Sequence, residues 1–444
     1  MIELLLSTAW GAPEFSLSSE TYVYFSESID QRLLARLRSK QENWTFDIRL
    51  LHQLNQTKQE MSIQGWELHY TYPLSSQSLF RIGQQTIRFG QLDLLSDLDV
   101  INGHDLSLGP TIIPEWKRIP SLAVQYQHSI GSWKTSLNWI PLSAKDRISW
   151  MNAPWGILSP SDVHTIVEEA QSWSGDFITE GWIRDMLSSV EKNITAQQNL
   201  PFPTTNSLDY GDIALQINQE TLGYSTSLYA AWLTSRRPQI RLHPNVRTYL
   251  EEERLPTSLE TSQINEIIEE PITISYPRQF LLGVDLATTI SVLGLRAEAS
   301  YNSNRVRTMY NLNSTTRPYT SASIALDYAF DMNLIALEAR AYHVIDGISN
   351  TWLEANDSIQ FALIGQFSLP YAWNLQMSGQ YDTILQDGFA QLQILKRFSP
   401  QWAISIQGMM LHGTISNKPL TYPSGIFGQW REYDHISFRI HWNP

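Results

Sequence analysis

The feature that most restricts how this chain can fold is an alternation of apolar and polar residues with a period of two, which recurs from one end to the other. Near the C-terminal end, the apolar set Ile436, Phe438, Ile440 and Trp442 alternates with the polar set His435, Ser437, Arg439 and His441. Successive side chains of a β-strand point to opposite faces, so this segment predicts a strand with one apolar and one polar face, not an amphipathic helix. The polar faces are too hydrophilic for the core of a β-sandwich.

About 18 segments follow this pattern, each close to the ~9–11 residues that a tilted transmembrane strand needs. They lie at 15–26, 32–39, 44–54, 61–72, 78–90, 120–130, 132–141, 208–217, 222–234, 277–289, 291–303, 319–330, 333–344, 357–368, 373–383, 389–397, 401–412 and 430–443. The pattern predicts an all-β fold, a closed antiparallel transmembrane β-barrel of about 18 strands (roughly 16–20). An even number lets the first strand pair with the last, and closure leaves no exposed edge.

The lengths of the links support the same fold. Tight links follow even-numbered segments, at Ile130–Ser132, Asn218–Thr221, Asp331–Met332, Leu369–Ala372 and Ser399–Pro400. Long links follow most odd-numbered segments, at 91–119, 142–207, 235–276, 304–318, 345–356 and 413–429. Outer-membrane barrels have short periplasmic turns and long external loops. We therefore expect periplasmic termini and one barrel over 13–444, with 91–119, 142–207 and 235–276 as loop or plug insertions.

The composition fits a barrel that faces a bilayer. The chain contains 16 Trp and 19 Tyr, which favour the membrane–water interface, and Trp133, Trp139, Trp373 and Tyr381 stand near the ends of predicted strands. No run of about 18 apolar residues occurs, which excludes membrane-spanning helices. The absence of cysteine argues against a disulfide-stapled secreted domain, and the net charge of -13 argues against nucleic acid as a partner.

The first twelve residues, MIELLLSTAWGA, are expected to be the remnant of a secretory signal peptide. Leu4–Leu6 form a short apolar core and small residues around Ala9 suit a cleavage site, but a basic segment before the core is missing. A plain N-terminal strand or tail is the alternative. Together with the barrel pattern, the remnant predicts the bacterial outer membrane as the location.

Two insertions have features of their own. Within 142–207, Ser161–Ala170 and Glu180–Lys192 have the pattern of short helices, which would cover or plug the mouth of the barrel. Residues 251–270 hold seven Glu and one Arg. A solvated acidic loop is the plain interpretation of this charge block. A cation-attracting rim, or a divalent-ion bridge to anionic lipid head groups, is the alternative.

Three pieces between Gly83 and Ile148 resemble a family of proteobacterial outer-membrane proteins, the domain-of-unknown-function 1302 group. They are GQQTIRFGQLD (83–93), with Phe89 where the family usually has Trp; DVINGHDL (99–106), with Gly103-His104 where the family commonly has Asn-Pro; and NWIPLSAKDRI (138–148), with the family's Ile-Pro and Asp-Arg elements. The resemblance implies a porin-like barrel that works alongside large transporters of lipids or other hydrophobic compounds.

A group of polar residues in 91–119 is the candidate constriction of a pore. It consists of Asp93, Asp97, Asp99, Asn102, His104 and Asp105, followed by Lys117 and Arg118. Folded into the barrel, carboxylates opposite basic residues would screen solutes by charge. A hydrogen-bonded turn without solute contact is the alternative, because Asp and Asn favour turns for local reasons.

Charged residues on the polar faces of the predicted strands are expected to point into the lumen, because a charge facing lipid costs about 2–4 kcal/mol at the bilayer midplane. They are Lys134, Arg296, Glu338, Arg340, Arg397 and Arg439. Structural salt-bridge ladders are one use for such residues, and a selectivity filter is the other.

The sequence predicts a porin-like channel or conduit for solutes, not an enzyme. It contains no G-x-S-x-G, H-E-x-x-H or Walker loop, and its ten His lack metal-ligand spacing, so neither a cofactor nor a metal is expected. Expected partners are outer-membrane lipid and lipopolysaccharide, with a periplasmic or inner-membrane transporter as a further candidate. Two alternatives stay open. An accessory of a lipid-export system predicts an apolar patch inside the barrel, and an outer-membrane hydrolase predicts a close Ser, His and acid grouping.

Overall fold

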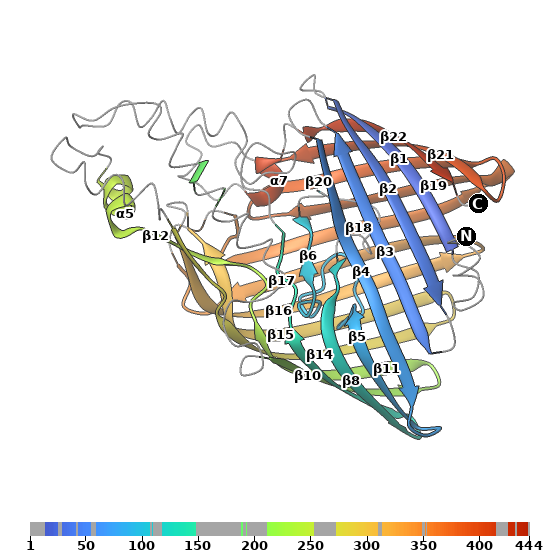
Figure 1. Cartoon of the computed structure of the whole chain (residues 1–444), viewed down its shortest axis with the longest axis horizontal. Helices are drawn as coiled ribbons and strands as arrows, with labels where there is room; N and C mark the ends of the chain where they lie inside the picture. The colour runs from blue at the N-terminus through green and yellow to red at the C-terminus, as the bar shows by residue number, and fades with distance from the viewer. Residues whose placement is uncertain are drawn as a thin grey trace.

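Eighteen antiparallel strands form one sheet in the described part of the chain (Figure 1). The computed structural model describes residues 14–24, 29–40, 43–54, 59–106, 109, 118–147, 188–189, 192, 211–252, 272–309, 313–348, 351, 353–413, 425–430 and 433–442. The strands of the sheet are β1 (Glu14–Tyr24), β2 (Ile29–Lys40), β3 (Trp44–Leu54), β4 (Gln59–Pro73), β5 (Ser78–Gln85), β8 (Ser121–Ile130), β9 (Trp133–Leu142), β10 (Asp212–Thr221), β11 (Tyr224–Thr234), β14 (Arg278–Ile290), β15 (Leu293–Thr308), β16 (Ser314–Phe330), β17 (Asn333–Val344), β18 (Asp357–Leu369), β19 (Trp373–Asp382), β20 (Asp387–Arg397), β21 (Trp402–His412) and β22 (His435–Trp442).

The sheet is closed, because β1 is paired along both of its sides. Ser18 of β1 stands opposite Leu34 of β2 on one side and opposite His441 of β22 on the other. The other described strands pair with their neighbours in chain order around the ring. A sheet without an edge satisfies its backbone hydrogen bonds internally, which is what a β-structure needs in lipid. The predicted closed barrel of 18 strands is confirmed.

Apolar side chains of the wall point outward. On β14, Leu282, Val284 and Leu286 are exposed, while Leu281 and Asp285, which point to the other face, are buried. Exposed large apolar side chains recur at outward positions around the ring and form a belt. A closed barrel with such a belt is the β-structure of the bacterial outer membrane, so the predicted location follows from the geometry of the wall.

Tight links lie at one end of the barrel, which we call the turn end. Those that lie wholly within the described residues are 74–77, 131–132, 222–223, 291–292, 331–332, 370–372 and 398–401. The first strand starts and the last strand ends at this same end. Glu14 of β1 stands opposite Arg38 near the end of β2, and Trp442 of β22 stands opposite Trp402, directly after the last of these links. The strand ends that adjoin the long links lie at the opposite end, the loop end. This arrangement agrees with the predicted register of short turns and long loops.

The predicted and observed strands correspond one to one, and they differ at their ends. β15 and β16 are longer than predicted, so the predicted link 304–318 shortens to 309–313. The reason is that pairing resumes after a bulge, with Arg305 opposite Arg317. The predicted tight link at Asn218–Thr221 is also wrong. These residues belong to β10, and the chain turns at Leu222-Gly223, where Gly223 has a φ of 97° that glycine adopts without strain.

Short elements occupy the links. They are β6 (Gly103–His104), β7 (Arg118–Ile119), β12 (Gln239–Leu242), β13 (Ile272–Ser275), α5 (Pro244–Glu251), η3 (Pro370–Ala372) and α7 (Gly425–Gln429). β6 pairs with β7, β12 pairs with β13, and β12 packs against β15 and β16. Figure 1 shows α5 beyond the loop end of the wall. Within the described ranges, no helix has the length and apolar character needed to cross a bilayer.

Some predictions concern residues that lie wholly or mostly outside the described ones. The signal remnant 1–12 and the helix Ser161–Ala170 are entirely outside. Of Glu180–Lys192, only residues 188, 189 and 192 are described, and they are helical. Of the acidic stretch 251–270, only Glu251 and Glu252 are described, at the end of α5. These four interpretations stay predictions.

Candidate constriction inside the barrel

The chain leaves the wall after β5 and folds into the barrel. We call residues 86–106 the inner loop. The predicted strand 78–90 is therefore too long, since its last five residues belong to this loop. The inner loop lies against inward-facing positions of the wall, as the contact between Leu98 and Gly283 shows. A Cβ atom at Gly283 would stand 2.2 Å from Leu98 Cδ2, so β14 provides a glycine where the loop needs the space of a missing side chain.

Apolar side chains of the inner loop pack on small residues of the inner wall. One buried cluster joins Ile87, Phe89, Leu98 and Ile101 to Ala123, Ile140, Ala214, Tyr229, Ala231, Leu233 and Leu281. A second cluster joins Leu92 and Leu95 to Ala325 and Ala362. Each such side chain contributes about 1.5–3 kcal/mol when it is buried. The barrel therefore does contain an apolar patch on its inner wall, and the loop covers it.

Two glutamates of the inner wall accept backbone hydrogen bonds from the inner loop. Glu298 Oε1 accepts the N–H groups of residues 91–92, the second at 2.7 Å, and Glu298 Oε2 accepts the Ser96 hydroxyl at 2.7 Å. Glu338 accepts the next three N–H groups, of residues 93–95, at 2.8, 3.0 and 2.9 Å. Five consecutive N–H groups of the loop thus point at two carboxylates of the wall.

Asp97 joins the inner loop to arginines of β15 and β17. Its Oδ1 lies 3.0 Å from Nη1 of both Arg305 and Arg340, and its Oδ2 accepts the hydroxyl of Tyr319 at 2.9 Å. Burial alone would raise the pKa of Asp97, but the two guanidiniums and the hydrogen bonds outweigh it and hold this pKa below its ordinary value. Asp97 is therefore ionised at neutral pH.

Two other aspartates of the predicted constriction also form ion pairs. Asp93 Oδ2 lies 2.9 Å from Arg296 Nη1, and Asp99 Oδ2 lies 2.7 Å from Arg118 Nη2. His104 Nε2 is 3.9 Å from Asp99 Oδ2. Burial raises the pKa of Asp99, and the contacts with His104 and Arg118 lower it further than burial raises it, so the net shift is downward.

Asn102 and Asp105 are fully buried and stabilise the inner loop itself. The Asn102 side chain accepts the N–H of Ile87 at 3.1 Å and donates to the carbonyl of Ile87 at 2.5 Å. Asp105 Oδ2 lies 3.5 Å from Arg147 Nη1. These contacts fit the alternative interpretation, a hydrogen-bonded turn. Lys117 lies outside the described residues.

The six charges predicted to face the lumen stand at inward positions of their strands. Arg296, Glu338 and Arg340 contact the inner loop, as described above. Arg439 is buried on β22. Lys134 and Arg397 are exposed near the turn end, opposite Asn218 and Ala403. Three of the six predicted residues therefore contact the inner loop, and the other three do not.

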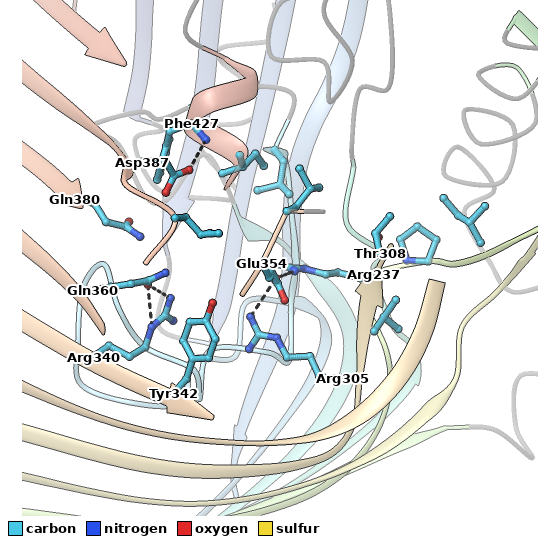
Figure 2. A pocket seen from close by; sticks show the side chains of 17 residues that line it. Arg237, Arg305, Thr308, Arg340, Tyr342, Glu354, Gln360, Gln380, Asp387 and Phe427 are labelled. Carbon is cyan, nitrogen blue, oxygen red and sulfur yellow. Dashed lines mark hydrogen bonds and ion pairs between the residues drawn. The ribbon is translucent and has the colours of Figure 1, made fainter. Parts of the chain in front are cut away.

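Two cavities flank the inner loop near the loop end, and both are lined by Arg237, Arg305 and Arg340. The first, of about 240 Å³, also contacts Asp97, Asp99, Asp146 and Arg236. The second, of about 220 Å³, also contacts Glu354 and Asp387 (Figure 2). Guanidiniums outnumber carboxylates by four to three in the first cavity and by three to two in the second. Each cavity thus has a small excess of positive charge.

Glu354, from the link between β17 and β18, is held by three arginines. Figure 2 shows the guanidiniums of Arg237 and Arg305 directed at its carboxylate. Arg305 Nη2 lies 3.6 Å from Glu354 Oε1, and Arg307 Nη1 lies 3.7 Å from Glu354 Oε2. Burial would raise the pKa of Glu354, but the charges of Arg305, Arg237 and Arg307 hold it well below its ordinary value.

Sequence reasoning missed several residues of this site. The prediction places Arg305 and Arg307 in a link, because the bulge after Asn302 interrupts the alternation that would have assigned them to β15. Glu298 shares the polar face of Arg296, so the alternation does place it inside the barrel, although its role in holding the loop has no sequence signal. Glu354 and Arg237 come from links, where no pattern indicates their neighbours.

A Ser–His pair lies on the outer surface of the wall. Ser78 Oγ and His128 Nδ1 are 2.7 Å apart, at paired positions of β5 and β8. His128 has the same parity as the exposed Tyr126 and Ile130, so it faces outward. No carboxylate of the described residues contacts His128.

Comparisons with known proteins add the following. No family model and no curated protein matches the chain. Among solved structures, it is similar to OccK2 (OpdF) of Pseudomonas aeruginosa, with a TM-score of 0.47, 8% identity and 97% of each chain covered. It is also similar to OccK8 (OprE) of the same organism, with a TM-score of 0.47 and 7% identity over 97% of this chain and 96% of OccK8. A third similar structure is OccAB3 of Acinetobacter baumannii, with a TM-score of 0.45 and 6% identity over 97% of this chain and 98% of OccAB3.

Proposed function

We propose that this protein is a passive channel of the bacterial outer membrane, narrowed by its inner loop. The observation that carries the proposal is a closed barrel with a lipid-facing belt and a largely polar inner wall, against which a loop is fixed by both apolar packing and ion pairs. A polar inner wall in a barrel of this size suits the passage of hydrated solutes. The inner loop supplies the narrow part.

The charges at the narrow part favour small anionic solutes. Both cavities have one guanidinium more than they have carboxylates, and the planar guanidinium of arginine binds carboxylate or phosphate groups in two-point contacts. The excess is small because Asp97 and Glu354 already neutralise part of the arginine charge. We therefore infer a modest preference for anions over cations.

Reconstitution into planar bilayers tests the proposal. A salt gradient across the bilayer gives a reversal potential, and its sign reports whether anions or cations carry more of the current. We expect single-channel steps and a weak anion preference. The same measurement on a variant lacking residues 148–210, between Arg147 and Gly211, tests whether this insertion limits the flow. If neither the full chain nor the deletion variant conducts ions, although both barrels are folded, the channel function is refuted.

An accessory role in the export of lipids or other hydrophobic compounds is the second candidate. It follows from the resemblance of residues 83–148 to the domain-of-unknown-function 1302 family, which stays a hypothesis, as do lipopolysaccharide and a transporter as partners. The apolar patch that this role predicts does occur inside the barrel, but Leu92, Leu95 and Leu98 cover it. Lipid that copurifies with the protein from a native extract and occupies the lumen would favour this role over the channel.

A further inference from the structure

The N–H groups of residues 91–95 depend on the two wall glutamates for their hydrogen bonds. Leu92 and Leu95 are buried, so their N–H groups are withdrawn from water. A buried N–H without an acceptor costs about 1–3 kcal/mol. A carboxylate offers two oxygens with several acceptor positions, which is why one Glu338 side chain serves three consecutive donors.

The wall is shaped to present these glutamates to the loop. Glu338 stands between Ala325 of β16 and Ala362 of β18, and these two alanines also form the floor on which Leu92 and Leu95 pack. Small neighbours leave the carboxylate accessible to the backbone of the loop. Glu298 stands next to Ser323, whose hydroxyl donates to the carbonyl of Leu95 at 3.2 Å.

The docked segment also positions a charge of the constriction. Asp97 follows two residues after the last docked N–H, and it reaches Arg305 and Arg340 only with the loop against the wall. If the loop moves into the lumen or out of it, the aperture changes and both arginines lose this carboxylate. Aperture and charge selectivity therefore depend on the same contacts.

We propose that Glu298 and Glu338 are docking residues that hold the inner loop in place, and that the docked loop sets the aperture and the ion selectivity of the barrel together. The inference rests on the proposed channel function. It assigns to these two acids a positioning role through backbone N–H groups, not a direct contact with solute. Their charge is directed at the loop.

Single-channel recording of Glu298→Gln, Glu338→Gln and the double variant tests the proposal. Glutamine has nearly the same size, but it replaces one acceptor oxygen by an NH₂ donor, which cannot accept the N–H groups of the loop. We expect the double variant to increase the mean conductance or its fluctuations by roughly twofold or more, and to shift the reversal potential toward stronger anion preference. Loss of negative wall charge alone would shift the reversal potential without altering the conductance in this way.

Glu220→Gln is the matched control. Glu220 faces inward on β10 near the turn end, and none of its hydrogen bonds involves the inner loop. It loses one negative charge, as each single glutamine variant does, and the inner loop keeps both wall glutamates, so we expect wild-type conductance. If the glutamine variants fold, as heat-dependent migration in SDS gels reports, the docking role is refuted when both single variants have the conductance and reversal potential of Glu220→Gln and the double variant has wild-type conductance.

A second pair of variants keeps the proposal testable if the glutamine variants do not fold. Ser96→Ala and Ser323→Ala each remove one hydrogen bond that a neutral hydroxyl donates between loop and wall, and they leave every charge in place. We expect the double alanine variant to show a smaller change in the same direction, and an unchanged channel would count against docking. If the wild type is silent while the undocked variants conduct, docking stands and the open-channel function fails.

Discussion

Asp97 and Arg340 are 243 positions apart in the chain, and yet Asp97 Oδ1 lies 3.0 Å from Arg340 Nη1 inside the barrel. The same oxygen lies 3.0 Å from Arg305 Nη1. One carboxylate of the inner loop thus neutralises two arginines of the wall, which links the position of the loop to the charge of the lumen.

Replacement of Asp97 by Asn is expected to strengthen anion preference and to weaken the attachment of the loop. Loss of one partner of a largely buried ion pair costs about 2–5 kcal/mol, and Arg305 keeps Glu354 as a partner, so we expect the lower part of this range. The reversal potential in a salt gradient and the midpoint of urea unfolding measure the two effects. Asp346→Asn, on an exposed link residue, is the control. An unchanged reversal potential would show that Asp97 does not influence permeating ions.

The negative charges of Asp97 and Glu354 are expected to resist acid. Arginine neighbours hold the pKa of Asp97 and of Glu354 below the ordinary values, so both stay ionised at pH values where exposed carboxylates are protonated. A lowered folded-state pKa gives stability that is present above the unfolded-state pKa and is lost as the pH falls through the folded-state value. We expect the difference in reversal potential between the wild type and Asp97→Asn to stay constant from pH 7 down to about 4, and to change only below it. A titration centred near pH 5 would contradict this assignment.

A methyl group at Gly283 is expected to displace the inner loop. The added Cβ atom would stand 2.2 Å from Leu98 Cδ2, and overpacking of this kind costs about 1–3 kcal/mol. Gly283→Ala should therefore lower the unfolding midpoint and alter the conductance. The double variant Gly283→Ala with Leu98→Ala should recover much of the conductance, because the shortened side chain makes room. If the effects of the two substitutions on conductance are additive, Leu98 and Gly283 are not in contact in the membrane.

Apolar tips of the turn end are expected to lie in the inner leaflet of the membrane. Leu222, Met332 and Phe398 are exposed by 105%, 80% and 64%, and they continue the outward parity of the belt. Since the chain has no cysteine, single cysteines at these positions can carry one environment-sensitive dye each. We expect blue-shifted emission that brominated lipid quenches. Asp346→Cys at the loop end serves as the aqueous control, and quenching of the turn-end dyes by iodide at the rate of this control would refute the placement.

Ser78 is expected to be inert toward fluorophosphonate probes. A serine nucleophile needs its histidine oriented by a third group, and the described residues provide no carboxylate at His128. Incubation of the reconstituted protein with a tagged probe, followed by gel fluorescence, measures labelling, and Ser78→Ala is the control. Labelling that disappears in Ser78→Ala would revive the hydrolase alternative.

The sequence by itself determined the barrel. Strict alternation, as in Ile436 to Trp442, assigns each side chain to lipid or lumen. It can be recognised in the sequence because a β-strand has a side-chain period of two whichever strand it pairs with. The inward positions of Arg296, Glu338 and Arg340 follow from the same rule. Tight and long links then fix which end carries the loops.

The tertiary structure alone decided how the interior is organised. Nothing in the alternation says that residues 91–95 meet Glu298 and Glu338, because an irregular loop has no period and its partners lie more than 200 positions away. The bulge after Asn302 hid Arg305 and Arg307 for a related reason, since one extra residue reverses the parity of everything that follows. Contacts between a loop and a wall depend on shape and charge in three dimensions, and the order of residues along the chain does not record them.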